Sequence, residues 1–118
     1  MNKEALDVED VLIRVQDDKE LLIELLDIFE GFYPEKRELL DTLIKEGNLS
    51  EFKDVVHSIK GAAGNISAKA LHDSCLKLEK MALEKDIESI TKTLPDLDVQ
   101  FQELQECIAE VKKDFQDE

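Results

Sequence analysis

His57 is the residue of this chain whose type and surroundings could do chemistry. Apolar residues recur around it at helical spacing and gather on one side of the expected helix: Phe52, Val55, Val56, Ile59, Ala62, Ala63 and Ile66. His57 falls on the opposite side, with Lys53 one turn before it and Lys60 one turn after it. A neutral imidazole nitrogen is nucleophilic near neutral pH, and an ammonium group can neutralise the oxygens of a transferring phosphoryl group. These residues therefore indicate a phosphoryl acceptor, with Lys60 as the stabilising cation and Lys53 adding a weaker field.

Two glycines, Gly61 and Gly64, share the helix face of His57. Each costs roughly 0.5–1 kcal/mol relative to alanine in a helix interior, so their presence needs a compensating gain. Close approach by a partner would supply that gain, because a side chain at either position would stand beside the imidazole. We therefore expect a docking surface at Gly61, Gly64 and Lys53, around an accessible His57.

The composition is that of one small globular domain, residues 1–118, with 42% hydrophobic residues and a modest core. A formal net charge of −14 makes nucleic acid and anionic membrane surfaces poor partners. No stretch approaches roughly 18 consecutive apolar residues, and the first residues hold no signal-peptide run, so we expect a cytoplasmic protein outside the membrane. Cys75 and Cys107 occupy apolar helix positions and form no CxxC motif, which predicts reduced core thiols and no metal site.

Helical periodicity along nearly the whole chain predicts an all-α fold. Capping and turn residues place the expected helices at about 8–15, 18–45, 48–64, 67–85 and 86–115. The residues used for these boundaries are Asp7, Asp17 or Asp18, Gly47, Asn48, Ser67 and Asp86. Pro34 is expected to kink or break the second helix, because it removes a backbone donor and crowds the preceding turn.

The last expected helix has an apolar repeat that stays in phase across Pro95, which favours one long helix over two. Its members recur at intervals of three and four residues: Ile87, Ile90, Leu94, Leu97, Phe101, Leu104, Ile108, Val111 and Phe115. Such a stripe fits the seam of an intramolecular bundle or a dimeric coiled coil. The other helices need a partner for their own apolar faces, which favours the bundle and a monomer.

The chain lacks the parts of a kinase. It contains no GxxxxGK[ST] loop and no GxGxxG motif after a strand, so we expect no enzyme activity of that kind and no bound cofactor. A phosphoryl group on His57 would have to arrive from another protein and leave for another. That partner would also bring Mg²⁺, because Asp54 is the single carboxylate close to His57 in the sequence.

The segment around His57 resembles the signature of the histidine-containing phosphotransfer (HPt) domain family of two-component phosphorelays. The matching residues run from Val56 to Ile66 and continue with Leu71, Cys75, Leu78 and Glu79; weaker matches extend outward to Asp7, Leu12, Arg14, the 21–29 segment, Pro34, Gly47 and Asn48. One departure is Ser67, where many members have glycine. Serine is a good N-cap, so this change puts only the local turn in doubt.

The resemblance implies an antiparallel four-helix bundle with a short N-terminal helix covering one end. It implies that His57 is phosphorylated, that Lys60 stabilises the phosphoryl group and that Gly61 keeps the ring accessible. The implied function is a phosphorelay carrier between a phospho-aspartate receiver domain, or a histidine kinase, and a response-regulator aspartate. Two alternatives stay open: a phosphoacceptor segment of a larger chemotaxis-type or hybrid kinase, and an adaptor that binds receiver domains without phosphorylation. His72 lacks a lysine three residues later and is expected to be an ordinary helix residue.

Overall fold

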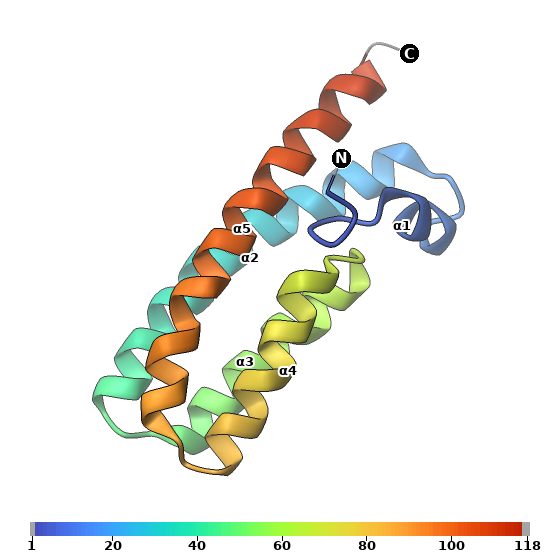
Figure 1. Ribbon diagram of the computed structural model, residues 1–118. Coiled ribbons are helices and arrows are strands. Elements are labelled where there is room, and N and C mark those ends of the chain that lie inside the picture. Colours follow the sequence, from blue (N-terminus) through green and yellow to red (C-terminus); the bar gives the residue numbers. More distant parts are fainter. Residues whose placement is uncertain (1, 117–118) are drawn as a thin grey trace.

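The computed structural model describes residues 2–116, which form five helices and no strand (Figure 1). The helices are α1 (Val8–Arg14), α2 (Lys19–Lys45), α3 (Leu49–Asn65), α4 (Lys69–Leu83) and α5 (Ile87–Gln116). The all-α fold is therefore confirmed, and each predicted boundary lies within about two residues of the observed one. None of these helices is both long enough and apolar enough to cross a membrane.

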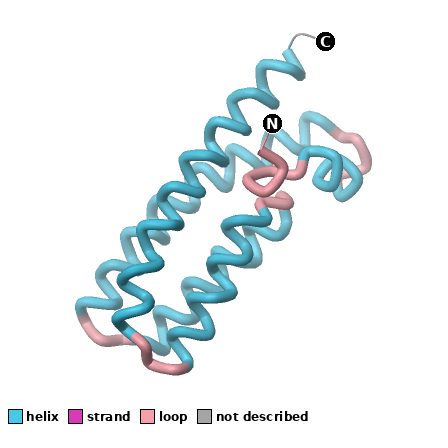
Figure 2. The backbone as a smooth tube through the Cα atoms, in the orientation of Figure 1, coloured by secondary structure: helices cyan, strands magenta, loops and turns pink. Residues whose placement is uncertain are grey.

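Helices α2 to α5 lie lengthwise and each runs antiparallel to the next, in a molecule measuring 49 × 21 × 21 Å. Helix α2 contacts α3 and α5, and α4 contacts the same two helices, so the four close into a bundle. The α2–α3 and α4–α5 loops lie at one end, and the α3–α4 loop lies at the other (Figure 2). The short helix α1 packs against α2 at that second end.

The core consists of one apolar stripe from each long helix. Seven residues of the α5 stripe are buried by contacts with other parts of the same chain: Ile90, Leu94, Leu97, Phe101, Leu104, Ile108 and Val111. At the two ends of the predicted repeat, Ile87 is 45% exposed, and Phe115 is half-buried and packs against the edge of the core. The repeat therefore forms the seam of the bundle, as the intramolecular interpretation predicts.

Both prolines lie inside continuous helices, Pro34 in α2 and Pro95 in α5. The break that Pro34 could have produced is absent from the structure. Side chains beside these prolines join the two helices: Arg37 Nε donates to Asp98 Oδ1 at 2.9 Å, and Tyr33 stacks on Phe101 with ring centroids 4.1 Å apart. These contacts hold α2 against α5 at the level where each loses a backbone donor.

Helix caps follow the sequence prediction except at α4. The side chains of Asp7, Asp18 and Asn48 each accept a hydrogen bond from a backbone N–H three residues later, and Asp86 does so from Ser89. The N-cap position of α4 is Ala68, which has no side-chain cap, so the predicted capping role of Ser67 was wrong. Ser67 has φ of 59°, in the left-handed region, and its hydroxyl donates to Asp10 Oδ2 at 2.6 Å.

That hydrogen bond is one of several that attach the N-terminal segment to the bundle. The backbone N–H of Asp7 donates to Ser67 O at 3.0 Å, and that of Ala70 donates to Glu4 O at 2.7 Å. Lys69 Nζ lies 2.9 Å from Asp7 Oδ2. The residues ahead of α1 thus close the end of the α3–α4 hairpin.

Candidate functional site

Helix α3 turns His57 outward because its apolar stripe fixes the opposite face in the core. Phe52, Val56 and Ile59 are completely buried, whereas the His57 side chain is 69% exposed. The predicted accessibility of the imidazole is therefore what the structure shows. Lys60, one turn later, is much less exposed, at 19% of its side chain.

A carboxylate from the neighbouring helix α4 joins His57 and Lys60. Glu79 Oε1 lies 3.1 Å from His57 Nδ1 and accepts from Lys60 Nζ at 2.9 Å. The Glu79 side chain is 18% exposed, so this three-residue cluster is mostly shielded from solvent on the side of the carboxylate. Its one mostly exposed side chain is the imidazole. Glu79 belongs to the family signature in the sequence, but its role becomes visible only through this contact.

The contact at Nδ1 determines which nitrogen of His57 is available for reaction. A carboxylate can only accept, so the neutral ring carries its proton on Nδ1 and points it at Glu79. The lone pair then lies on Nε2. Because the ring is mostly exposed, Nε2 is the nucleophilic atom that a partner can reach.

Glu79 is ionised at neutral pH despite its shelter. Burial raises the pKa of its carboxyl, but hydrogen bonds from Lys60 and His57 outweigh burial and bring the pKa below its ordinary value of 4.5. The resulting charge fixes the orientation of the ring. A phosphoryl group at Nε2 would create a positive charge on the ring, and the Glu79 carboxylate beside Nδ1 would stabilise that charge.

The two glycines differ in their surroundings. Gly61 is exposed, and a Cβ added there would meet no atom within 4 Å, which leaves open space one turn from His57. Gly64 is half-buried, and a Cβ there would lie 3.4 Å from His72 Cδ2. Gly64 therefore lies against α4, a contact that the sequence interpretation missed. Lys53 is half-exposed on the same side of α3 as His57.

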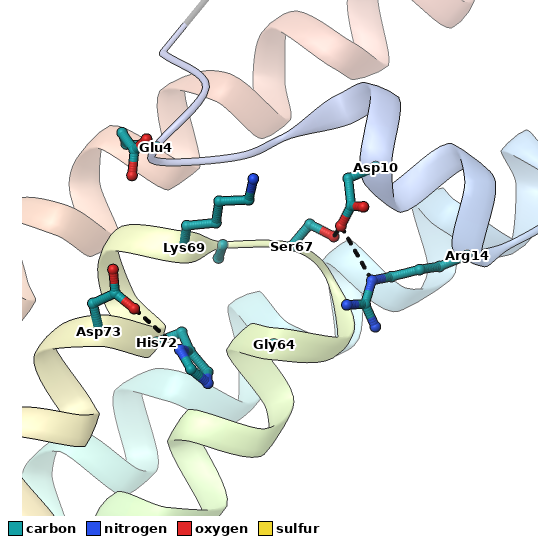
Figure 3. Close-up of a pocket in the computed structure, with 9 residues that line it drawn as sticks. Glu4, Asp10, Arg14, Gly64, Ser67, Lys69, His72 and Asp73 are labelled. Atoms are coloured by element: carbon teal, nitrogen blue, oxygen red, sulfur yellow. Dashed lines mark hydrogen bonds and ion pairs between the residues drawn. The ribbon is translucent and has the colours of Figure 1, made fainter.

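His72 belongs to a different part of the surface, a pocket at the end of the bundle that α1 covers (Figure 3). Its Nδ1 lies 3.3 Å from Asp73 Oδ1, on the adjacent residue, and its side chain is 39% exposed. In the same pocket Arg14 pairs with Asp10 at 3.2 Å. The ring is partly buried, and among the residues that the structure describes no lysine pairs with Asp73.

Both cysteines are free and buried, as predicted. Cys75 lies on α4 one turn before Glu79, and burial raises the pKa of its thiol to about 12. The thiol is therefore protonated and inert at neutral pH. It contributes apolar volume behind the His57 cluster and no chemistry.

Comparison with known proteins agrees with this geometry. A family model described as the Hpt domain matches residues 24–114, most of the chain. The HPT domain of the Hpt sensor hybrid histidine kinase from Shewanella superposes with a TM-score of 0.80 at 15% identity, covering 96% of this chain and 97% of that domain. No curated protein sequence matches the chain. The extent of the family match shows that the chain belongs to the Hpt domain family.

Proposed function

We propose that this protein is a phosphorelay carrier that takes a phosphoryl group onto His57 Nε2 from a phospho-aspartate receiver domain, or from a histidine kinase. It then passes the group to the aspartate of a response regulator. Membership of the Hpt family supports histidine phosphotransfer as the general role. The single observation that carries the assignment to His57 is the contact of Nδ1 with Glu79, which leaves Nε2 on the exposed side of the ring.

The transfer step follows from the tautomer. The Nε2 lone pair attacks phosphorus while the bond between phosphorus and the aspartyl oxygen breaks, and that oxygen leaves as part of a free carboxylate. The N–P bond forms and Nδ1 keeps its proton, so the ring becomes cationic and no proton has to leave. Glu79 stabilises this cation through Nδ1. Transfer onward reverses the same bonds on another aspartate.

Lys60 is the proposed cation for the phosphoryl oxygens. In the unphosphorylated protein its ammonium group is held by Glu79, on the same oxygen that contacts His57. The ammonium group of Lys60 therefore lies close to the imidazole before any partner binds. The receiver domain brings Mg²⁺ with its own carboxylates, and the exposed Gly61 leaves room for that domain to approach.

The experiment is to incubate the protein with ³²P-labelled phosphorylated receiver domains and compare it with His57→Gln and His72→Gln. Wild type and His72→Gln should gain a label that is lost in acid and stable in base, which is the behaviour of phosphohistidine. His57→Gln should gain none, with unchanged helicity by circular dichroism. Label on His57→Gln, or loss of label in His72→Gln alone, would contradict the assignment.

A further inference from the structure

The turn between α4 and α5 holds a lysine in a backbone conformation that suits glycine. Lys85 has φ of 57°, in the left-handed region, where a Cβ crowds the neighbouring carbonyl oxygen. The α2–α3 turn, at the same end of the bundle in Figure 2, has Gly47 at the corresponding position with φ of 70°. In both turns this residue donates to the carbonyl three positions earlier, and the next residue donates to the carbonyl five positions earlier. The α4–α5 turn is therefore strained at Lys85, whereas Gly47 leaves the other turn relaxed.

The apolar residues on either side of this turn are exposed. Leu76 is 52% exposed and Leu83 67% exposed on α4, and Ile87 is 45% exposed at the start of α5. Single exposed apolar residues are ordinary, so only a pattern could give these three a role.

The spacing of the three residues continues the α5 stripe backward through the turn. Intervals of four and three residues connect positions 76, 80, 83 and 87, and the same intervals then connect the buried residues from Ile90 to Val111. Lys80 is the one polar residue at these positions between 76 and 111. An unbroken repeat of this kind is typical of one continuous helix packed along a partner. The turn at 84–86 interrupts that repeat and leaves its first apolar members in solvent.

We propose that the α4–α5 turn is a hinge whose opening joins α4 and α5 into one helix and lets two copies of the chain exchange α5. Opening returns Lys85 to a helical φ and so removes the strain. Each α5 then packs on α2 and α4 of the second copy, so the contacts of the closed bundle form again between the copies. The joined helix, residues 69–116, would be about 70 Å long.

The exposed residues beside the hinge obtain a partner in the exchanged dimer. A two-fold axis near residue 85 would cross the two joined helices in opposite directions. Leu83 and Ile87, one turn apart on the joined helix, would then lie against the same residues of the second copy. Their burial is a gain that the closed form lacks.

Two terms oppose the exchange. Asp86 caps α5 in the closed turn, where its carboxylate accepts from the N–H and the hydroxyl of Ser89, and opening removes this cap. Each copy also has a formal net charge of −14, so the two copies repel each other. We therefore expect the dimer to be the minor form at low salt and to increase as salt is added.

The exchange leaves the His57 cluster complete in each copy. His57 and Lys60 lie on α3, and Glu79 lies on α4 before the hinge. Helix α5 supplies none of the three side chains. The dimer would therefore carry two intact clusters, and its formation can be tested without any phosphoryl donor.

The first test measures the dimer directly. Wild type is unfolded, refolded at millimolar concentration and examined by sedimentation and small-angle X-ray scattering, which should reveal a dimer roughly twice as long as the 49 Å bundle. Lys85→Gly should raise the dimer dissociation constant at least about tenfold, because glycine relaxes the closed turn and disfavours the joined helix. Leu83→Ser/Ile87→Ser should also raise it. The matched control, Leu21→Ser/Ile28→Ser on the exposed face of α2, should keep the wild-type constant.

The second test separates exchange from side-by-side association. Arg37 on α2 contacts Asp98 on α5, so Arg37→Asp and Asp98→Arg each place like charges across that contact. Refolded together, the two variants should form a heterodimer, because exchange of α5 restores opposite charges at both contacts. Refolded separately, each should remain without such a dimer. Absence of any wild-type dimer, a dimer that Lys85→Gly leaves unchanged, or a mixture without heterodimer would overturn the inference.

Discussion

The two histidines of this protein both contact a carboxylate through Nδ1, yet their surroundings are opposite. His57 contacts Glu79, which comes from another helix, is 18% exposed and is bound by Lys60. His72 contacts Asp73, its neighbour in the chain, which is 67% exposed. The ring of His57 is 69% exposed, whereas that of His72 is 39% exposed and faces Gly64.

Under the proposed function, the difference indicates which features of a histidine–carboxylate pair favour a phosphoryl acceptor. A carboxylate that is half in solvent exchanges its partners freely, and its charge is screened by water. A carboxylate fixed between two helices and neutralised by a lysine holds the ring in one tautomer and one direction. We therefore propose that the reactivity of His57 depends on this mostly buried carboxylate–lysine pair, and that access to the ring depends on the missing side chain at Gly61.

The largest expected effect is on access. Gly61→Gln should stabilise the protein by a few tenths to about 1 kcal/mol through helix propensity, yet slow transfer from a receiver by at least about a hundredfold. Gly31→Gln is the matched control, because Gly31 is also exposed within a helix and has no atom within 4 Å of an added Cβ. That control should gain similar stability and keep full activity. Melting temperature and transfer rate should be measured on both; equal rates would remove access as the role of Gly61.

The next largest effect is expected on the transfer rate when Lys60 is removed, the cation beside His57 that has no counterpart at His72. Lys60→Ala should slow transfer at saturating receiver at least about tenfold, because one positive charge near the phosphoryl oxygens is lost. The loss of unfolding free energy should stay below about 1 kcal/mol, since the Lys60–Glu79 pair is only partly sheltered. Lys77→Ala, on the exposed side of α4, is the control and should transfer at the wild-type rate. Rapid-quench measurement of phosphohistidine gives the rates. An unchanged rate for Lys60→Ala would show that Lys60 does not contribute to transfer.

The smallest expected effect is on the free energy of unfolding, and it concerns the carboxylates of Glu79 and Asp73 that contact the two histidines. The pKa of Glu79 in the folded protein lies below its ordinary value of 4.5, so its ionised form stabilises the fold. That contribution is complete above pH 4.5 and disappears as pH falls through the lowered pKa. Glu79→Gln should therefore be less stable than wild type at neutral pH, and the gap should close in acid.

Denaturant unfolding of both proteins between pH 3 and about 7 measures this gap. Asp73→Asn is the control for the His72 pair and should show a smaller gap at neutral pH, because Asp73 is mostly exposed. A gap for Glu79→Gln that does not depend on pH would mean that its carboxylate charge stabilises nothing.

The helices and the exposure of His57 could be predicted because both follow from local rules. Apolar spacing determined which face of each helix is buried, and side-chain caps at Asp7, Asp18 and Asn48 marked three of the starts. The same spacing placed His57 opposite the core. Such patterns depend only on residues within a few turns of each other.

What could not be predicted depends on residues far apart in the sequence or on backbone geometry. Glu79 is 22 positions from His57, so only the packing of α4 on α3 reveals their contact. The contact between Gly64 and His72 has the same origin. Ser67 looked like an N-cap, but the turn requires a positive φ there, and its hydroxyl bonds to Asp10. The glycine that many family members have at this position would meet the same backbone requirement without strain.

The attachment of the N-terminal segment has a consequence for the order of folding. The bundle is built from hairpins of consecutive helices, whose contacts need only short loops to close and form quickly. The segment before α1 instead joins partners far along the chain, at Ser67, at Ala70 and, through Asn2, at Glu103. We therefore expect it to dock last, after the α3–α4 hairpin has formed. In the native protein it should also be the first part to detach, so its amide hydrogens should exchange with solvent sooner than those of the helices that hold His57.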